Sequence, residues 1–208
     1  MPGLNYKNFR TGIILSVLCG LVLFIISWLY GKNAFFLLLN TDLGIFADYF
    51  FRFFSDLGDG LLWIPLLIYY FLKEGKKLLP FFVSCFAITT IITQVCKQVI
   101  IPGELRPTRA ITSEFIHLVN GVTVHSAASF PSGHTATAFV FYLIFCLVFK
   151  NSLWLIIGLL YALIVGYSRI YLAQHFPLDI AGGIIVAVVS VIIALFIQAA
   201  YNKRYLNK

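Results

Sequence analysis

The stretch LDIAGGIIVAVVSVIIALFIQAA, residues 178–200, decides the fold of this chain. Its only charged residue is Asp179, next to its beginning. A run of about 20 apolar residues is long enough to cross the hydrocarbon core of a bilayer as a helix. The stretch therefore predicts a transmembrane helix that carries a carboxylate in its first turn.

Similar apolar runs recur upstream, at roughly residues 11–30, 59–73, 78–101, 132–149 and 152–171. Of the 208 residues, 61% are hydrophobic and 11% are charged, and the mean hydropathy is +0.94. A soluble domain carries roughly a quarter charged residues. We therefore predict an all-α membrane bundle of six transmembrane helices, forming one domain over residues 1–208 with its motifs in residues 59–200. The second run is short and contains Pro65, so this helix is expected to begin earlier or to be kinked.

Residues 33–57 mix apolar and charged side chains. Aromatic residues recur there at near-helical spacing, at Phe46, Tyr49, Phe50, Phe53 and Phe54. This pattern predicts an additional helix lying in the membrane interface, where the rings serve as anchors and not as a substrate site. The first run follows Lys7 and Arg10, is too long for a signal-peptide core and lacks an evident cleavage site. It is expected to be an uncleaved first transmembrane helix.

Charges between the runs predict the topology. A cytoplasmic N-terminus would place nine basic residues inside, with Glu74 as their only acidic neighbour: Lys7, Arg10, Lys73, Lys76, Lys77, Lys150, Lys203, Arg204 and Lys208. It would place six outside: Lys32, Arg52, Lys97, Arg106, Arg109 and Arg169. Because cytoplasmic segments carry an excess of Lys and Arg, both termini are expected in the cytoplasm. The segment 102–131 would then face outward, towards the periplasm if the membrane is a bacterial inner membrane.

Composition also argues against a nucleic-acid-binding protein and against cysteines that form disulfides or bind metal. The net charge is +7, but the basic residues flank apolar runs and form no patch, so no nucleic-acid partner is expected. The four cysteines, Cys19, Cys85, Cys96 and Cys146, lie inside apolar runs. They are expected to be small packing residues, and not disulfides or metal ligands.

The tetrapeptide Pro131-Ser132-Gly133-His134 stands where the fourth apolar run begins. Serine is a favoured N-cap residue, and a helix N-terminus offers free N–H groups to an anion. Gly133 would let a phosphate approach the backbone closely. A plain serine-capped helix start explains the tetrapeptide about equally well when it is considered alone.

A second group of polar residues lies between the fifth and sixth runs, at Ser168, Arg169, His175 and Asp179. Pro177 suits the first turn of a helix, which places His175 just before the sixth helix. Asp179 could then accept a hydrogen bond from one ring nitrogen of His175 and leave the other nitrogen free as a nucleophile. Each residue also has a simpler explanation, a helix-dipole charge for Asp179 and interfacial snorkelling for Arg169. Those explanations do not account for both histidines at one membrane face.

Lys97 and Arg106 would complete a cationic site. A guanidinium matches phosphate oxygens bidentately, so two arginines and a lysine suit a phosphate dianion. Lys97 could instead complement a helix dipole, and Arg109 is expected to be a solvated loop residue. His117 and His125 could be paired with His134 and His175 in a zinc site, but their spacing matches no ligand motif, and loop roles are favoured. The outer segment 102–131 is long enough to be a lid or a substrate collar.

The chain resembles the type 2 phosphatidic acid phosphatase family, which shares its site with glucose-6-phosphatases and vanadium haloperoxidases. That family carries Lys-x6-Arg-Pro, Pro-Ser-Gly-His and Ser-Arg-x5-His-x3-Asp. The second motif is complete at residues 131–134 and the third at residues 168–179. The first motif departs, because eight residues separate Lys97 from Arg106 and include Pro102 and Gly103. A turn is expected just after the third helix.

The resemblance implies roles for these residues. His175 would attack phosphorus and form a phosphohistidine, Asp179 would orient it, and His134 would protonate the leaving oxygen and then activate water. The non-bridging oxygens would be bound by Lys97, Arg106, Ser132, the Gly133 backbone and Arg169. No metal and no cofactor are implied, since electrostatics and alignment can supply much of phosphoryl-transfer catalysis.

The leading hypothesis is therefore a metal-independent lipid phosphatase acting at the outer leaflet. Its candidate substrates are undecaprenyl diphosphate, phosphatidic acid, phosphatidylglycerol phosphate and lipid A phosphates. A lipid phosphotransferase that uses the same site is the alternative among enzymes. A non-enzymatic phosphate- or lipid-binding membrane protein is the alternative of another class. The sequence leaves the lipid and the oligomeric state open.

Overall fold

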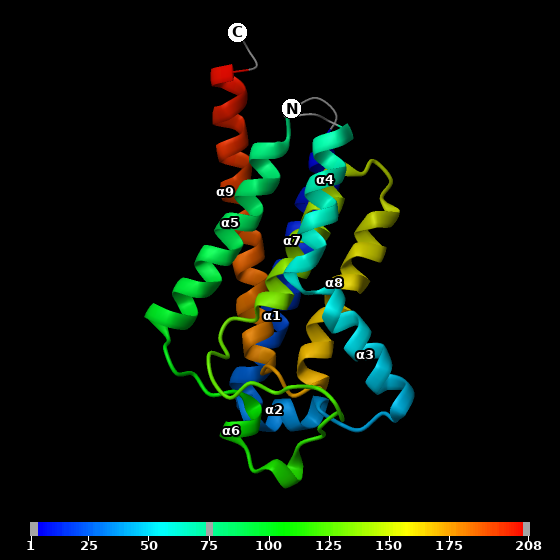
Figure 1. Ribbon diagram of the computed structural model, residues 1–208, viewed down its shortest axis with the longest axis vertical. Helices are drawn as coiled ribbons and strands as arrows, with labels where there is room; N and C mark the ends of the chain where they lie inside the picture. The colour runs from blue at the N-terminus through cyan, green and yellow to red at the C-terminus, as the bar shows by residue number, and fades with distance from the viewer. Residues whose placement is uncertain (1–3, 74–76, 206–208) are drawn as a thin grey trace.

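The computed structural model describes residues 4–73 and 77–205, and every regular element within them is a helix (Figure 1). The elements are α1 Tyr6–Tyr30, α2 Lys32–Leu39, α3 Ile45–Leu57, the 3-10 turn η1 Gly60–Leu62, α4 Trp63–Lys73, α5 Leu79–Val95, the π-helical turn η2 Cys96–Ile100, α6 Pro107–Ala110, η3 Ser113–Phe115, α7 Gly133–Val148, α8 Leu153–Tyr171 and α9 Pro177–Tyr205. The predicted all-α class is confirmed.

Four segments are long and apolar enough to cross a membrane: α1, α5 with η2, α8 and α9. The second and fourth predicted runs are also helical, but α4 has 11 residues and α7 has 16. Both are shorter than the roughly 20 residues that a bilayer requires. The sequence therefore located all six apolar helices, whereas four of them have the length of a complete span within the described residues.

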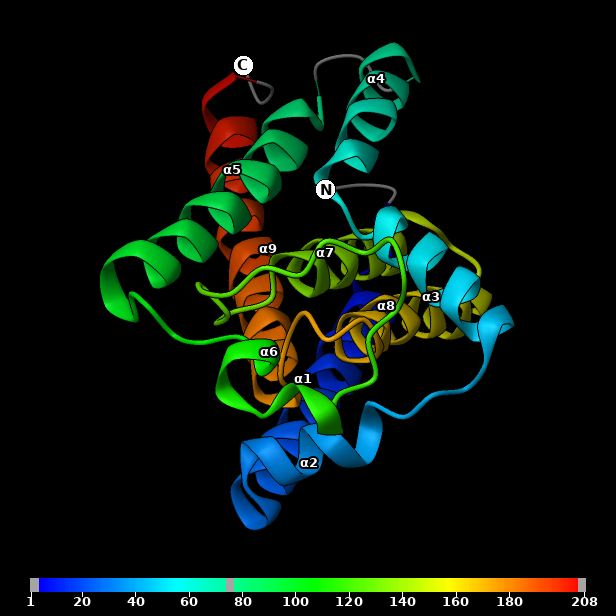
Figure 2. The same cartoon turned by 60° about the horizontal axis from the view of Figure 1, so that its bottom comes forward.

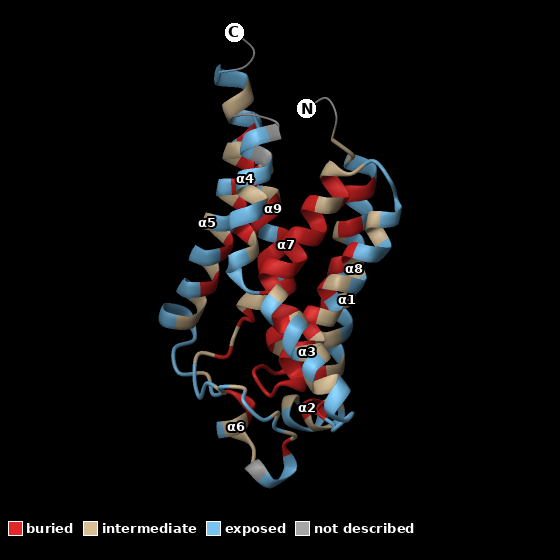
Figure 3. Ribbon diagram, turned by 45° about the vertical axis from the view of Figure 1, so that its right-hand side comes forward, coloured by how far each residue is buried: buried red, intermediate tan, exposed pale blue. Residues whose placement is uncertain are grey.

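Helix α7 is the centre of the bundle (Figure 3). Every residue from Thr135 to Leu147 except Phe145 is buried. The helix packs against α1, α5, α8 and α9. Since protein and not lipid surrounds α7, its length does not have to match the thickness of the hydrocarbon core.

The segment 33–57 forms two helices, where the sequence suggested one. The aromatic stretch is helical, as α3, but α2 precedes it and the chain breaks between Asn40 and Gly44. The Asn40 side chain donates to the backbone oxygens of Ile170 and Tyr171, at 3.1 and 2.8 Å, and Gly44 has a φ of +87°. Helix α3 then packs against α8. The break occurs because tertiary hydrogen bonds hold Asn40 at the end of α8, which no periodicity in the sequence indicates.

Pro65 does not interrupt α4, and α4 does not begin earlier than predicted. The 3-10 turn η1 leads into α4 at Trp63, so Pro65 is the third residue of that helix. In the first turn of a helix the missing proline N–H costs no hydrogen bond.

The start of α1 and the end of α9 lie at the same end of the molecule, whereas α2 and α6 lie at the opposite end (Figure 1). The backbone N–H of Asn5 donates to the Leu147 oxygen at 2.6 Å, which ties the start of the described chain to the end of α7. From η2 to α7 the chain runs across the opposite end of the bundle (Figure 2). Glu74, Lys76 and Lys208, which entered the topology argument, lie outside the described residues.

Candidate active site

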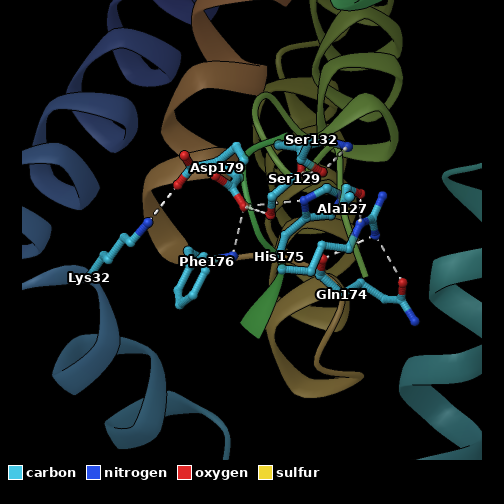
Figure 4. Close-up of polar contacts among 11 residues, drawn as sticks. Lys32, Ala127, Ser129, Ser132, Gln174, His175, Phe176 and Asp179 are labelled. Atoms are coloured by element: carbon cyan, nitrogen blue, oxygen red, sulfur yellow. Dashed lines mark hydrogen bonds and ion pairs between the residues drawn. The ribbon is translucent and has the colours of Figure 1, made fainter. Parts of the chain in front are cut away.

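His175 and Asp179 lie at the beginning of α9 and contact each other (Figure 4). The Nδ1 atom of His175 is 3.3 Å from Oδ2 of Asp179. The same carboxylate oxygen accepts from the Phe176 backbone N–H at 2.9 Å and from the Ser129 hydroxyl at 2.5 Å. His175 is 1% exposed and Asp179 is 3% exposed. The carboxylate is thus fixed by two further donors while it faces one nitrogen of the imidazole.

The turn between α8 and α9 fixes the position of the imidazole. The backbone N–H groups of Gln174 and His175 both donate to the Arg169 oxygen, at 2.9 and 3.1 Å. Pro177 is the first residue of α9, as its fixed φ predicts. The motif spacing therefore corresponds to the end of one helix, a tight turn and the first turn of the next helix.

The beginning of α7 is joined directly to the beginning of α9. Ser132 caps α7, because its Oγ accepts from the Thr135 N–H at 3.4 Å and from the Thr135 hydroxyl at 2.9 Å. The Ser132 N–H donates to the Asp179 backbone oxygen at 3.0 Å. A Cβ at Gly183 would lie 2.6 Å from the Ser132 oxygen, so only glycine permits this approach of the two helices. His134 follows in the first turn of α7.

His134 is within electrostatic range of Arg169, His175, Lys97 and Arg106. The two histidines and the three predicted cations, which are far apart in the sequence, therefore lie at one end of the bundle. This convergence depends on the alternating direction of α5, α7, α8 and α9 (Figure 1).

Arg106 is buried and partly occupied by hydrogen bonds to the chain. Its Nε donates to the Ala127 oxygen at 2.9 Å, and its Nη1 donates to the backbone oxygen and Oε1 of Gln174, at 3.1 and 3.0 Å. A guanidinium has five N–H donors. The two on Nη2 remain for an anion, so Gln174 and the loop act as a support that orients this arginine.

Arg169 has an unsatisfied donor. Its Nη1 donates to the Ser55 hydroxyl of α3, whereas its buried Nε has no hydrogen-bond partner among the described residues. A buried unpaired donor costs free energy unless a ligand or water completes it. The arginine is 7% exposed and lines an open cleft of about 320 Å³. A bound anion would supply the missing acceptor.

Lys97 lies in η2, where the departure from the family motif occurs. The π-helical turn and a following turn with Gly103 at a φ of +82° accommodate the two extra residues before Arg106. Lys97 remains within electrostatic range of Arg106, Arg169 and Asp179. The expected turn after the third helix is thus present, and Lys97 stays close to the other cations.

His125 was expected to be a plain loop residue, but it lines the same cleft as His134 and Arg169. His117 lies elsewhere, with Nε2 at 3.3 Å from Oδ1 of Asp48. Its ring nitrogen and the carboxylates of Asp42 and Asp48 could hold a metal ion by their mutual distances. The zinc alternative paired His117 and His125 with His134 and His175; among the described residues, the group close enough to hold a metal ion is a different one and contains His117 alone of these four histidines. Arg109 is exposed, as predicted.

Burial lowers the pKa of His175 well below its ordinary value, and the charges of Arg106, Arg169 and Lys97 lower it further. The imidazole is consequently neutral at pH 7. Only a neutral imidazole has a lone pair available for attack on an electrophile.

Three supporting residues were missed by the sequence analysis: Ser55, Ser129 and Gln174. Each is buried and bonds to a predicted site residue. Small polar residues in loops and at helix ends have no periodicity, so no sequence signal singled them out. The proximity of Ser129 to the tetrapeptide at 131–134 was the only available indication.

Comparison with known proteins gives the same family as the motifs. Residues 78–204 match the profile of the PAP2 superfamily. The chain belongs to the PAP2 superfamily. The lipid A 4'-phosphatase of Bacteroides thetaiotaomicron is 28% identical over 152 residues, 69% of this chain and 67% of that protein. The undecaprenyl-diphosphatase of Sulfolobus acidocaldarius is 31% identical over 135 residues, 63% of this chain and 61% of that protein.

Two solved structures share the architecture. Aquifex aeolicus LpxE superposes with a TM-score of 0.66 at 30% identity, covering 77% of this chain and 92% of that one. The phosphatidylglycerolphosphate phosphatase of Bacillus subtilis gives a TM-score of 0.59 over 95% and 97% of the two chains, and at 20% identity it supports the fold alone. With its family match and its phosphatase relatives, this chain is a phosphoric monoester hydrolase of the PAP2 type.

Proposed function

We propose that this PAP2 protein removes a phosphate group from a membrane lipid through a phosphohistidine on His175. One observation carries the proposal. Asp179 fixes the neutral, buried imidazole of His175 through Nδ1. His134 and the three cations, Lys97, Arg106 and Arg169, are close enough to interact electrostatically with this imidazole. The relatives named above act on lipid A and undecaprenyl diphosphate, so a lipid phosphate is the substrate class that fits a membrane-embedded site.

The geometry suggests which residue acts in each step of the reaction. With the Nδ1 proton held by Asp179, Nε2 of His175 carries the lone pair that attacks phosphorus in line. The phosphorus–oxygen bond to the lipid breaks as the new N–P bond forms, and His134 gives its proton to the leaving oxygen. His134 then takes a proton from water, whose oxygen attacks phosphorus and frees His175. Lys97, Arg106 and Arg169, with Ser132 and the Gly133 backbone, stabilise the charge on the non-bridging oxygens.

The proposal includes an orientation. The chain crosses the membrane six times with α4 and α7 as short crossings, both termini lie in the cytoplasm, and the site faces the periplasm of a bacterial inner membrane. Two observations support this orientation: the excess of basic residues in the predicted cytoplasmic segments, and the location of the start of α1 and the end of α9 at one end of the bundle.

Phosphate release tests the proposal. Purified protein in detergent is given phosphatidic acid, phosphatidylglycerol phosphate, a lipid A phosphate and undecaprenyl diphosphate, with and without orthovanadate. We expect vanadate-sensitive release from at least one lipid, and its loss in His175→Ala and His134→Ala. Turnover that persists in folded His175→Ala would contradict the assignment of the nucleophile.

A further inference from the structure

Lys32 is a cation beside the site that belongs to none of the motifs and has no part in the mechanism above. It is the first residue of α2 and lies outside residues 78–204, which match the family profile. Its ammonium group forms an ion pair with Oε1 of Glu104 at 2.5 Å. Figure 4 shows the side chain extending from α2 towards the beginning of α9, where Asp179 lies. The contacts of Lys32 therefore bear on the pair formed by His175 and Asp179.

Lys32 and Asp179 line the same cavity. This cavity has a volume of about 370 Å³, and its wall also includes Glu104. All other residues of the wall are apolar. Apolar surroundings screen a charge less than water does, so an ammonium and a carboxylate interact over a longer distance there. The charge of Lys32 accordingly acts on Asp179.

Glu104 connects Lys32 to one donor of the Asp179 carboxylate. The Glu104 backbone oxygen accepts from the Ser129 N–H at 3.1 Å, and the Ser129 hydroxyl donates to Oδ2 of Asp179 at 2.5 Å. The ion pair with Lys32 thus restrains the residue whose peptide oxygen holds Ser129 in place.

Phe176 connects Lys32 to a second donor of this carboxylate. The Nζ atom of Lys32 lies over the Phe176 ring, 5.0 Å from its centroid, which is the geometry of a cation–π interaction. The Phe176 N–H donates to the same Oδ2 atom at 2.9 Å. The ring also packs edge-on against Phe36 of α2, with the two centroids 5.5 Å apart. Helix α2 therefore contacts Phe176 directly and reaches Ser129 through Glu104.

Lys32 is separate from the surface that would bind the lipid phosphate. Neither Lys32 nor Glu104 lines the cleft that contains Arg169 and His134. Their side chains are 40% and 32% exposed, and a partly exposed ion pair contributes little to stability. Loss of the Lys32 charge should therefore leave the fold and the binding of phosphate intact.

We propose that Lys32 is a positioning residue for the reaction. Through its charge, Glu104 and Phe176, it holds the Asp179 carboxylate against Nδ1 of His175, so that the ring presents Nε2 to phosphorus. The inference depends on the proposed function, because it takes His175 as the nucleophile.

The test measures formation of the phosphoenzyme in a single turnover, over a range of lipid concentrations. The probe is the lipid that releases phosphate fastest in the phosphate-release test above, labelled in the transferred phosphate. Lys32→Met should lower the maximal rate about tenfold, because the imidazole is less well oriented. It should leave the half-saturating lipid concentration and the melting temperature unchanged. Lys32→Arg keeps the charge and can also lie over an aromatic ring, so it should retain about half or more of the wild-type rate.

A second pair of variants tests the connection through Glu104. Glu104→Gln keeps the backbone oxygen and the Lys32 charge, so it should lower the maximal rate less, about threefold. The double variant Lys32→Met/Glu104→Gln should be no slower than Lys32→Met alone, because the two residues act as one unit. A double variant in which the two losses multiply would contradict this connection.

Arg109→Met is the matched control, since Arg109 is an exposed cation of α6, which lies at the same end of the molecule as α2. It should leave the maximal rate, the half-saturating concentration and the melting temperature unchanged. A wild-type rate in Lys32→Met would overturn the inference, and so would a Lys32→Arg variant as slow as Lys32→Met. A raised half-saturating concentration at an unchanged maximal rate would make Lys32 a lipid-binding residue and would overturn it as well. If no lipid labels His175 in the wild type, the proposed function itself is wrong.

Discussion

At the scale of single residues, burial and charge act together on His175. The imidazole has almost no contact with solvent and lies among three cations, so protonation is unfavourable in the folded state. An imidazole in the unfolded chain has an ordinary pKa of about 6.5. The folded and unfolded states therefore bind different numbers of protons below that pH, and stability must depend on pH there.

We predict that the protein loses stability as the pH falls from 7 to 5. Because the folded-state pKa of His175 is lowered, the unfolded state takes up the proton first, which favours unfolding below about pH 6.5. This residue contributes up to about 1.4 kcal/mol per pH unit. Thermal unfolding in detergent measures the effect as a falling midpoint.

His175→Asn is the control for this pH dependence, because asparagine does not titrate. Its unfolding midpoint should fall less steeply between pH 7 and pH 5, whatever its stability at pH 7. Equal slopes for the two proteins would mean that His175 does not have a lowered pKa.

At the scale of elements, the site depends on the contact between the first turns of α7 and α9. Two glycines at this contact differ in their surroundings. A Cβ at Gly133 would meet only Thr93 Cγ2, at 3.6 Å, whereas a Cβ at Gly183 would lie 2.6 Å from a backbone oxygen. Packing requires a glycine at position 183 but not at position 133.

We predict opposite phenotypes for the two alanine variants. Gly183→Ala should lower the unfolding midpoint, because α9 must move away from α7, at a cost of about 1–3 kcal/mol. Gly133→Ala should retain the midpoint and lose most of its phosphate release, because the new methyl group obstructs the approach of phosphate to the backbone. Thermal unfolding and phosphate release are measured on both variants. A stable and fully active Gly133→Ala would contradict a phosphate contact at this backbone.

The elements that carry the motifs could be predicted closely from the sequence. Ser132 and Pro177 are the cap and the first residue that their types indicate, and Asp179 lies in the first turn of α9. These are local properties of the chain. The break at Asn40 and the hydrogen bond from Ser129 to Asp179 depend on partners distant in the sequence, so no local pattern revealed them.

At the scale of the whole molecule, the two ends of the helix bundle contain different parts of the chain. The start of α1 and the end of α9 are at one end, and the segment between η2 and α7 lies at the other (Figure 1). Hydropathy and charge predicted this alternation, because apolar length and the distribution of basic residues are properties of the whole chain. They could not predict that α7 is short and surrounded by other helices, since composition does not distinguish a buried helix from a lipid-facing one.

Cysteine labelling tests the orientation. Asn120, in the outer segment, and Asn151, between α7 and α8, are both exposed. In right-side-out membranes a membrane-impermeant maleimide should label Asn120→Cys, and it should label Asn151→Cys only after permeabilisation. The wild type gives the background from its four free cysteines. The reverse pattern would place the site in the cytoplasm.

Trapping the phosphoenzyme is the most direct test of the reaction. The protein is mixed with a lipid substrate labelled in its phosphate, quenched in base within one turnover and analysed by peptide mapping. A base-stable, acid-labile label on the peptide that carries His175, and none in His175→Asn, is the expected result. A label on any other residue, or phosphate release by folded His175→Asn at the wild-type rate, would contradict the account.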